Sequence, residues 1–137
     1  MKQVGFVGAF DKTDLIIYIA KILTVLGKRV LIADTTITQK AKYVVPALNP
    51  TLSYITEFEE IDIAVGFKNV EAIANYTNRS IETLEYDYLL LDIDSAESAM
   101  NFRIDRSVQN FFVTSFDTYD IRRGVEILGQ FQTPIKM

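Results

Sequence analysis

The chain has 137 residues, of which 49% are hydrophobic and 12% aromatic, a composition that fits one globular domain over residues 1–137 with an apolar core. Its formal net charge of −4 argues against a surface that coats nucleic acid, so we expect no direct nucleic-acid binding. The absence of cysteine and histidine excludes disulfides, thiolate metal sites and serine–histidine triads, whereas Mg²⁺ held by carboxylates and hydroxyls is compatible with the composition.

The sequence contains neither kind of segment that directs a chain into or through a membrane. No opening segment combines a basic start, an apolar run and a small-residue cleavage site. No uncharged apolar stretch approaches the roughly 20 residues that span a bilayer. We therefore expect a cytoplasmic protein without a transmembrane segment.

Strand-like and helix-like segments alternate along the chain. Residues 2–8 form a short apolar run that ends in glycine, which is typical of a buried parallel strand. The longer apolar run at 13–26 stops at Gly27, a good C-terminal cap, and predicts a helix that is apolar on most faces. Residues 29–34 predict a second strand with Asp34 at its carboxyl end.

The region that follows the second strand has weaker patterns than the rest of the chain. The elements predicted there are a short helix at 38–47, short strands at 53–58 and 61–67, and a helix at 69–76. The stronger patterns beyond it predict a strand at 86–94, a strand at 110–116, a helix at 117–131 and the start of a further strand at 133–137. The first of these later strands carries Asp92 at its far end.

Strands that alternate with helices predict an α/β fold, a doubly wound and mostly parallel sheet with helices on both faces. In such sheets, ligands bind outside the carboxyl ends of the strands. That edge would bring together residues 8–13, Asp34 and Asp92. We expect any functional site to lie there.

The stretch "GFVGAFDKTD" at residues 5–14 partly matches the phosphate-binding loop G-x-x-x-x-G-K-[ST]. In such a loop, backbone N–H groups surround the phosphates, the lysine reaches the outer phosphates, and the hydroxyl binds Mg²⁺. Lys12 and Thr13 are in place. Asp11 stands where a glycine should precede the lysine, and Gly5 lies one position before the expected first glycine.

Each of these residues also has a purely structural interpretation. Lys12 fits a solvated residue at a helix start, and Thr13 fits an N-terminal helix cap. Asp34 and Asp92 fit aspartates that stabilise the turns after strands. A flavin-binding or receiver-like doubly wound domain also fits the architecture, but it does not account for the lysine and threonine in the loop.

Three stretches together, "FVGAFDKTD", "LGKRVLIADTT" and "YDYLLLDID", resemble the deviant-loop P-loop ATPases typified by MinD and ParA. In that family the loop resembles G-K-G-G-V-G-K-T-T, and the later strands resemble "LGKRVLLIDAD" and "YDYIIIDTP". The segment "NFFVTSFDTYDIRRGVEIL" is similar to a later strand and helix of the family. The resemblance covers most of residues 2–131. Family members are usually longer, so it implies a domain that lacks the strands expected after Met137.

The resemblance implies roles for individual residues. Lys12 matches the phosphate lysine, Thr13 the magnesium hydroxyl, Asp34 the first aspartate of "DAD", and Asp92 the aspartate that holds Mg²⁺ through water. The candidate nucleotide-binding residues are Gly8, Asp11, Lys12, Thr13 and Asp34, and the candidate Mg²⁺ ligands are Thr13 and Asp92.

Four positions depart from the family pattern. Val7 replaces a second lysine that reaches the nucleotide of a dimer partner, and Thr36 replaces the aspartate that positions the attacking water. Ala9 and Asp11 replace loop glycines. A carboxylate at position 11 would repel phosphate, and the loss of the second lysine removes positive charge from the transition state of phosphoryl transfer.

The sequence therefore favours a degenerate ATPase-like domain that requires no cofactor. It would serve as a protein-interaction or assembly module of a cytoplasmic or membrane-associated machine, with a protein partner or as a homodimer. The alternative is a dimerising switch of the MinD and ParA type, in a secretion, pilus, partition or polarity system, that binds ATP or ADP with Mg²⁺ and hydrolyses ATP weakly. We expect no catalytic residue under the first interpretation and an ATPase under the second.

Overall fold

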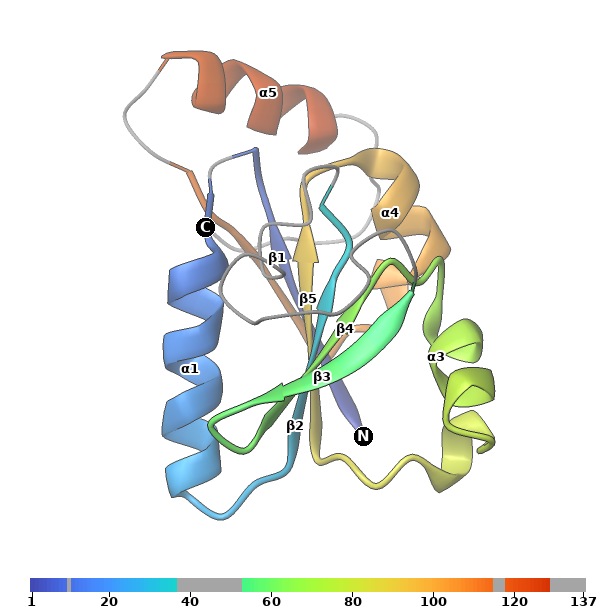
Figure 1. Ribbon diagram of the computed structural model, residues 1–137. Helices are drawn as coiled ribbons and strands as arrows, with labels where there is room; N and C mark the ends of the chain where they lie inside the picture. Colours follow the sequence, from blue (N-terminus) through green and yellow to red (C-terminus); the bar gives the residue numbers. More distant parts are fainter. Residues whose placement is uncertain (10, 37–52, 115–117, 129–137) are drawn as a thin grey trace.

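The computed structural model of the chain describes residues 1–9, 11–36, 53–114 and 118–128. Six strands form one sheet, with helices on both sides of it (Figure 1). The strands are β1 (Lys2–Val7), β2 (Val30–Asp34), β3 (Tyr54–Phe58), β4 (Ile61–Val65), β5 (Tyr88–Ile93) and β6 (Gln109–Phe112). The helices are α1 (Thr13–Val25), α3 (Val70–Tyr76), α4 (Ala96–Asn101) and α5 (Thr118–Leu128), with the 3-10 turns η1 (Ile81–Thr83) and η2 (Ile104–Arg106).

The strands follow the order β3-β4-β2-β5-β1-β6 across the sheet. Every neighbouring pair is parallel except β3 and β4, which pair antiparallel. The prediction of a doubly wound, mostly parallel α/β sheet is therefore confirmed, and the four strongest predicted strands lie side by side as β2, β5, β1 and β6. Because β2 and β5 are neighbours, Asp34 lies opposite Asp92 at the carboxyl edge.

The predicted and observed elements differ mainly at their ends. The strand predicted at 86–94 runs from Tyr88 to Ile93. The helix predicted at 38–47 and the strand predicted at 133–137 lie outside the described residues.

Helix α4 was missed because it has six residues, too few to show a helical hydrophobic period. It is instead marked by its cap, in which the hydroxyl of Ser95 accepts a hydrogen bond from the backbone N–H of Ser98. The 3-10 turns η1 and η2 were missed for the same reason, since each has three residues. A capping serine is therefore the signal that would have found α4.

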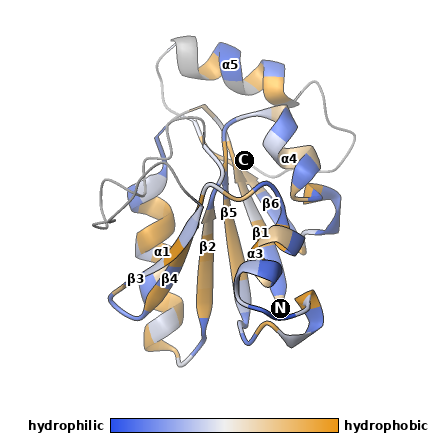
Figure 2. Cartoon of the chain, turned by 45° about the vertical axis from the view of Figure 1, so that its right-hand side comes forward, coloured by the Kyte–Doolittle hydropathy of each residue, from blue (hydrophilic) through white to orange (hydrophobic). Residues whose placement is uncertain are grey.

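Both faces of the sheet are covered, so its central strands are almost wholly buried. Successive side chains of a strand point to opposite faces. Ile32 and Leu90 pack in the cluster beneath α1, whereas Leu31 and Leu91 pack in the cluster on the side of α3 and α4. The hydrophobic colouring runs along β2 and β5 for this reason (Figure 2). The nearly unbroken apolar runs of the sequence are the signature of such doubly covered strands.

Helix α1 packs its buried residues Ile16, Ile17 and Ala20 chiefly over β2, β4 and β5. Among the described residues it is the only helix on its face of the sheet. The opposite face carries α3 and α4, and Ile127 of α5 joins the core cluster there. Within the described part of the chain, no helix is long and apolar enough to cross a bilayer.

Candidate functional site

The loop that connects β1 to α1 begins with a close contact between two backbone segments. Gly8 donates its N–H to the carbonyl oxygen of Ile93 (3.0 Å), and Val113 donates its N–H to the carbonyl oxygen of Val7 (2.8 Å). A Cβ at Gly8 would lie 2.0 Å from the carbonyl oxygen of Val113. Gly8 is therefore required for the approach of two chain segments at the start of the loop, whatever it does for a ligand.

Gly5 is a strand residue and not a displaced loop glycine. It pairs with Leu91 and Asn110 in the middle of β1. A Cβ at this position would lie 2.3 Å from the side-chain oxygen of Asn110, which is buried beside it. The missing side chain of Gly5 thus makes room for a buried amide that donates a hydrogen bond to the carbonyl oxygen of Ile104 (3.1 Å).

Lys12 lies at the N-terminus of α1, as the loop pattern predicts, but its side chain is wholly enclosed. It is 2% exposed, which excludes a solvated surface lysine. Its Nζ donates to the carbonyl oxygen of Gly8 (2.9 Å) and lies 2.8 Å from Oδ1 of Asp92. The ammonium group therefore has a carboxylate and a carbonyl of the same chain as its partners.

Asp92 connects the loop to the centre of the sheet. The hydroxyl of Thr13 donates to its Oδ2 over a long 3.4 Å. Burial raises the pKa of the Asp92 carboxyl; the ammonium of Lys12 opposes that rise, and the charges of Asp34 and Asp11 add to it. The ion pair with Lys12 therefore stabilises the ionised form of this buried carboxylate.

Asp34 is bound by the threonine that replaces the second aspartate of the family pattern. Thr36 donates both its backbone N–H (3.0 Å) and its hydroxyl (2.6 Å) to Oδ1 of Asp34. Both residues are buried. Thr36 therefore closes a turn around Asp34, a role in which a second carboxylate would repel the first.

Asp11 lies at the N-terminus of α1, where the four first N–H groups of a helix have no partner within it. Its Oδ1 accepts a hydrogen bond from the backbone N–H of Thr13 (3.2 Å). A phosphate bound at a helix N-terminus takes hydrogen bonds of this kind. The side chain of Asp11 thus uses one of the donors that a phosphate-binding loop offers to its ligand.

Val7 occupies the position of the family's second lysine and belongs to the core. Its exposed fraction is 0%, and it packs in the cluster on the side of α3 and α4. A lysine here would bury a charge in an apolar environment. In this chain the position cannot reach a partner's nucleotide without rebuilding β1.

The structure adds three residues that sequence reasoning missed. Thr35 donates its hydroxyl to the backbone carbonyl of Asp92 (2.6 Å), and Ser98 of α4 donates to the carbonyl of Thr35 (3.1 Å). Burial, and after it the charge of Asp34, raises the pKa of Tyr54 at the start of β3. The run of two threonines directly after a strand was the available signal for Thr35.

The candidate Mg²⁺ ligands are brought together but form an incomplete set. Thr13 and Asp92 supply one hydroxyl and one carboxylate, and the nearest cation to that carboxylate is Lys12. No group of three or more acidic side chains close enough to hold a metal occurs in the part of the chain that the structure describes. Mg²⁺ commonly keeps several waters and binds one or two carboxylates together with phosphate oxygens. The donors therefore fit Mg²⁺ only as a companion of a bound phosphate.

Comparisons with known proteins find similarity in structure alone. No protein-family model matches the chain, and no curated protein matches it. The chain is similar to the MinD protein in the MinC:MinD cell division protein complex of Aquifex aeolicus, with a TM-score of 0.64 and 16% sequence identity. The fold is that of MinD-like P-loop proteins. The match covers 94% of this chain and 62% of the MinD-like structure's chain, so the present chain spans less than two thirds of that length.

The MinD-like fold explains why the candidate residues meet. Each lies at the carboxyl edge of the sheet or in the loop that follows it, and Lys12 and Thr13 both contact Asp92 there. Asp34 is a neighbour of Asp92 across β2 and β5. The matched structure is a complex of two proteins.

Proposed function

We propose that this chain is a non-catalytic relative of MinD-type ATPases that acts as a protein-interaction or assembly module and requires no nucleotide. The observation that carries the proposal is that two of the groups that would bind a phosphate already have partners within the chain. The N–H of Thr13 donates to Asp11, and the ammonium of Lys12 contacts Asp92 and Gly8. A phosphate must displace a carboxylate from the first donor and separate a buried ion pair to reach the second.

Two further features support the absence of catalysis. Val7 replaces the second lysine with a buried aliphatic side chain. Thr36 donates two hydrogen bonds to Asp34 and has no carboxylate with which to orient water. Removal of a cation that stabilises the transition state of phosphoryl transfer costs roughly 10³-fold or more in rate.

A second function, a switch that binds ATP or ADP with Mg²⁺, is favoured by one observation. Lys12 and Thr13 both contact Asp92, and these are the three residues that the ATPase pattern needs most. If Lys12 turns from Asp92 toward a phosphate, Mg²⁺ could take its place beside the carboxylate and the hydroxyl of Thr13. In that case Asp11 is the main obstacle to binding.

Calorimetric titration with ATP and ADP, with and without Mg²⁺, separates the two functions. We expect no binding by the natural chain at millimolar ligand and no ATP hydrolysis. Hydrolysis that is lost in Lys12→Met would contradict the proposal and support the switch.

Two substitutions of Asp11 then locate the obstacle. Asp11→Asn removes the charge but keeps an oxygen for the N–H of Thr13, whereas Asp11→Gly removes both. We expect Asp11→Gly to bind nucleotide, Asp11→Asn to bind it more weakly, and neither to hydrolyse it. Asp14→Asn is the matched control, because it removes one carboxylate from the exposed first turn of α1 without opening the loop. Equal gains in Asp14→Asn and Asp11→Gly would show that net charge, and not occupation of the loop, prevents binding.

A further inference from the structure

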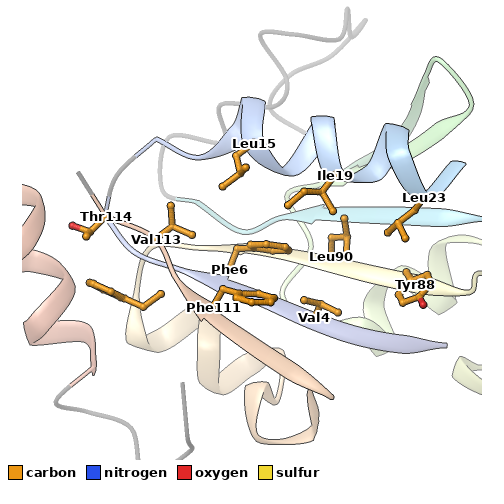
Figure 3. A pocket seen from close by; sticks show the side chains of 11 residues that line it. Val4, Phe6, Leu15, Ile19, Leu23, Tyr88, Leu90, Phe111, Val113 and Thr114 are labelled. Carbon is orange, nitrogen blue, oxygen red and sulfur yellow. The ribbon is translucent and has the colours of Figure 1, made fainter. Parts of the chain in front are cut away.

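An apolar groove of about 640 Å³ lies between α1 and β6, over β1 and the adjoining part of β5 (Figure 3). Leu15, Ile19 and Leu23 point into it from α1. Its floor includes the stacked rings of Phe6 and Phe111, whose centroids are 5.6 Å apart. Phe111 remains 38% exposed. Among the described residues, nothing shields this side of the ring from solvent.

Of the described helices, α1 alone lies over this face of the sheet, and one helix does not cover six strands. Neighbouring strands lie about 4.8 Å apart and a helix is about 10 Å wide, so one helix covers roughly two to three strands. Helix α1 packs chiefly over β2, β4 and β5. The groove therefore runs beside α1, over β6 and the adjoining side of β1, although Phe6 of β1 is itself only 3% exposed.

Helix α1 also has an apolar surface on the side that faces away from its own sheet. Tyr18 is 65% exposed, Val25 86% and Leu26 67%, and Ile22 lies between them. These side chains, with Lys21, surround a shallow depression of about 290 Å³. We call this the outer face of α1. Contiguous exposed apolar surfaces of this kind mark interaction sites.

One flank of α1 contacts another part of the chain through an ion pair that is about half exposed. Lys21 forms an ion pair with Glu59, at the tip of the hairpin between β3 and β4. The other flank, with Leu15, Ile19 and Leu23, faces the groove. The chain thus presents both an apolar groove and a helix whose exposed surface is apolar.

We propose that the groove is filled by α1 of a second copy of this chain, in a twofold-symmetric dimer. The two sheets face each other, and the two α1 helices lie side by side between them. The outer face of each α1 packs on β1 and β6 of the other copy, and the flanks with Ile19 meet at the axis. A twofold interface requires a self-complementary surface, and here one chain supplies both halves of the contact. This interface lies on the face of the sheet and does not use the loop at residues 8–13.

The oligomeric state of the chain is the first test. Sedimentation velocity should show a species of twice the 15.6 kDa chain mass. The double substitution Tyr18→Glu with Val25→Glu should yield the monomer with an unchanged circular dichroism spectrum. Met100→Glu is the matched control, because Met100 is 68% exposed on α4, on the other side of the sheet. A monomeric natural chain, or a dimer that survives the double substitution, would overturn the proposal.

Mixed dimers test the reciprocal contact. Phe111→Glu disables the groove but leaves the outer face of α1 intact, whereas the Tyr18 and Val25 variant has the opposite defect. Each variant should be monomeric alone, and an equimolar mixture should form a heterodimer through one remaining contact. Failure to form heterodimers, while both variants stay folded, would contradict mutual insertion of the helices.

The absence of cysteine permits a direct measurement of what fills the groove. A Val25→Cys chain that carries a nitroxide label but no ¹⁵N, mixed with ¹⁵N-labelled natural chain, should broaden the amide signals of Val4 and Tyr88 more than that of Ile73 on the opposite face. Broadening centred on Lys12 would indicate a different dimer. A monomer that co-sediments with lipid vesicles through Tyr18 and Val25 would assign the outer face to a membrane and overturn the proposal.

ATP distinguishes this inference from the proposed function. The dimer should form equally with and without ATP and Mg²⁺, since the groove does not include the loop residues. Dimerisation that requires ATP would contradict both the closed loop and the groove dimer. Dimerisation without ATP, together with measurable ATP binding, would leave the dimer intact and reject only the non-catalytic function.

Discussion

The carboxyl edge and the groove are built on the same strands, β1 and β5. The polar groups of the edge have partners within the chain, whereas the groove exposes apolar side chains to solvent. At the edge, Lys12 is 2% exposed and every charge that it needs is supplied by the chain. In the groove, Phe111 and Leu15 remain 38% and 43% exposed. A site that satisfies its own polar groups has little affinity left for a ligand, whereas an uncovered apolar surface gains free energy from any complementary partner. Both proposals above rest on this difference between the two regions.

The largest expected effect comes from breaking the ion pair at the edge. Lys12→Met should lower the free energy of unfolding by about 3–5 kcal/mol, because it leaves the buried carboxylate of Asp92 without its partner. Chemical denaturation at neutral pH measures the loss. The double variant Lys12→Met with Asp92→Asn should recover most of it, since no buried charge remains. A loss below 1 kcal/mol in the single variant would show that the pair is open to water.

The pH dependence of the same variant sharpens the interpretation. The pKa of Asp92 is raised in the folded state above its ordinary 3.8, so the folded chain holds this proton more tightly than the unfolded chain does. This group's contribution to stability therefore falls as the pH rises from about 3.8 through the raised pKa. Loss of Lys12 removes the charge that opposes the rise. The deficit of Lys12→Met relative to the natural chain should thus shrink as the pH is lowered from neutrality, and a deficit that does not change with pH would contradict this origin.

An intermediate loss of stability is expected from a substitution in the middle of β1, the strand that the two regions share. Gly5→Ala places a methyl group against the buried amide of Asn110. Overpacking of this kind costs about 1–3 kcal/mol. Asn110→Ala, combined with Gly5→Ala, should recover part of the stability because it removes the clash, although the hydrogen bond to Ile104 is lost with it. Thermal unfolding of the three variants measures the coupling, and additive losses would rule out a direct contact.

The smallest expected effect lies in the groove. Phe111→Ala should cost the monomer about 1 kcal/mol, because the ring is partly exposed and loses mainly its stacking on Phe6. Phe102→Ala is the control: its ring is 2% exposed, and buried Phe→Ala substitutions cost about 3–5 kcal/mol. Denaturation at low and high protein concentration separates folding from association. Equal costs for the two substitutions at low concentration would show that the groove is closed within the monomer.

The elements that could be predicted from the sequence are those whose local pattern agrees with their packing. The strands β2 and β5 were predicted within two residues because their apolar runs are long and both of their faces are buried. Helix α1 was predicted from the length of its apolar run and from Gly27. Some of its apolar residues pack on the sheet and others are exposed, and the sequence alone does not show which are which. The antiparallel pairing of β3 with β4 was not predicted. Its turn uses Glu59 and Glu60 at positive φ, where glycine or asparagine would be the usual signal.

The sequence by itself determined the α/β fold and the convergence of Lys12, Thr13, Asp34 and Asp92, because parallel strands with crossovers bring their carboxyl ends to one edge. It also showed that Asp11 stands in the place of a glycine. Only the tertiary structure decided what these side chains contact: that Lys12 is buried against Asp92, that Gly5 accommodates Asn110, and that Val7 belongs to the core. These contacts join residues up to 105 positions apart, as between Gly5 and Asn110, and depend on which strands are neighbours in the sheet. No local pattern contains that information, because side-chain partners are chosen by the packing of the whole sheet.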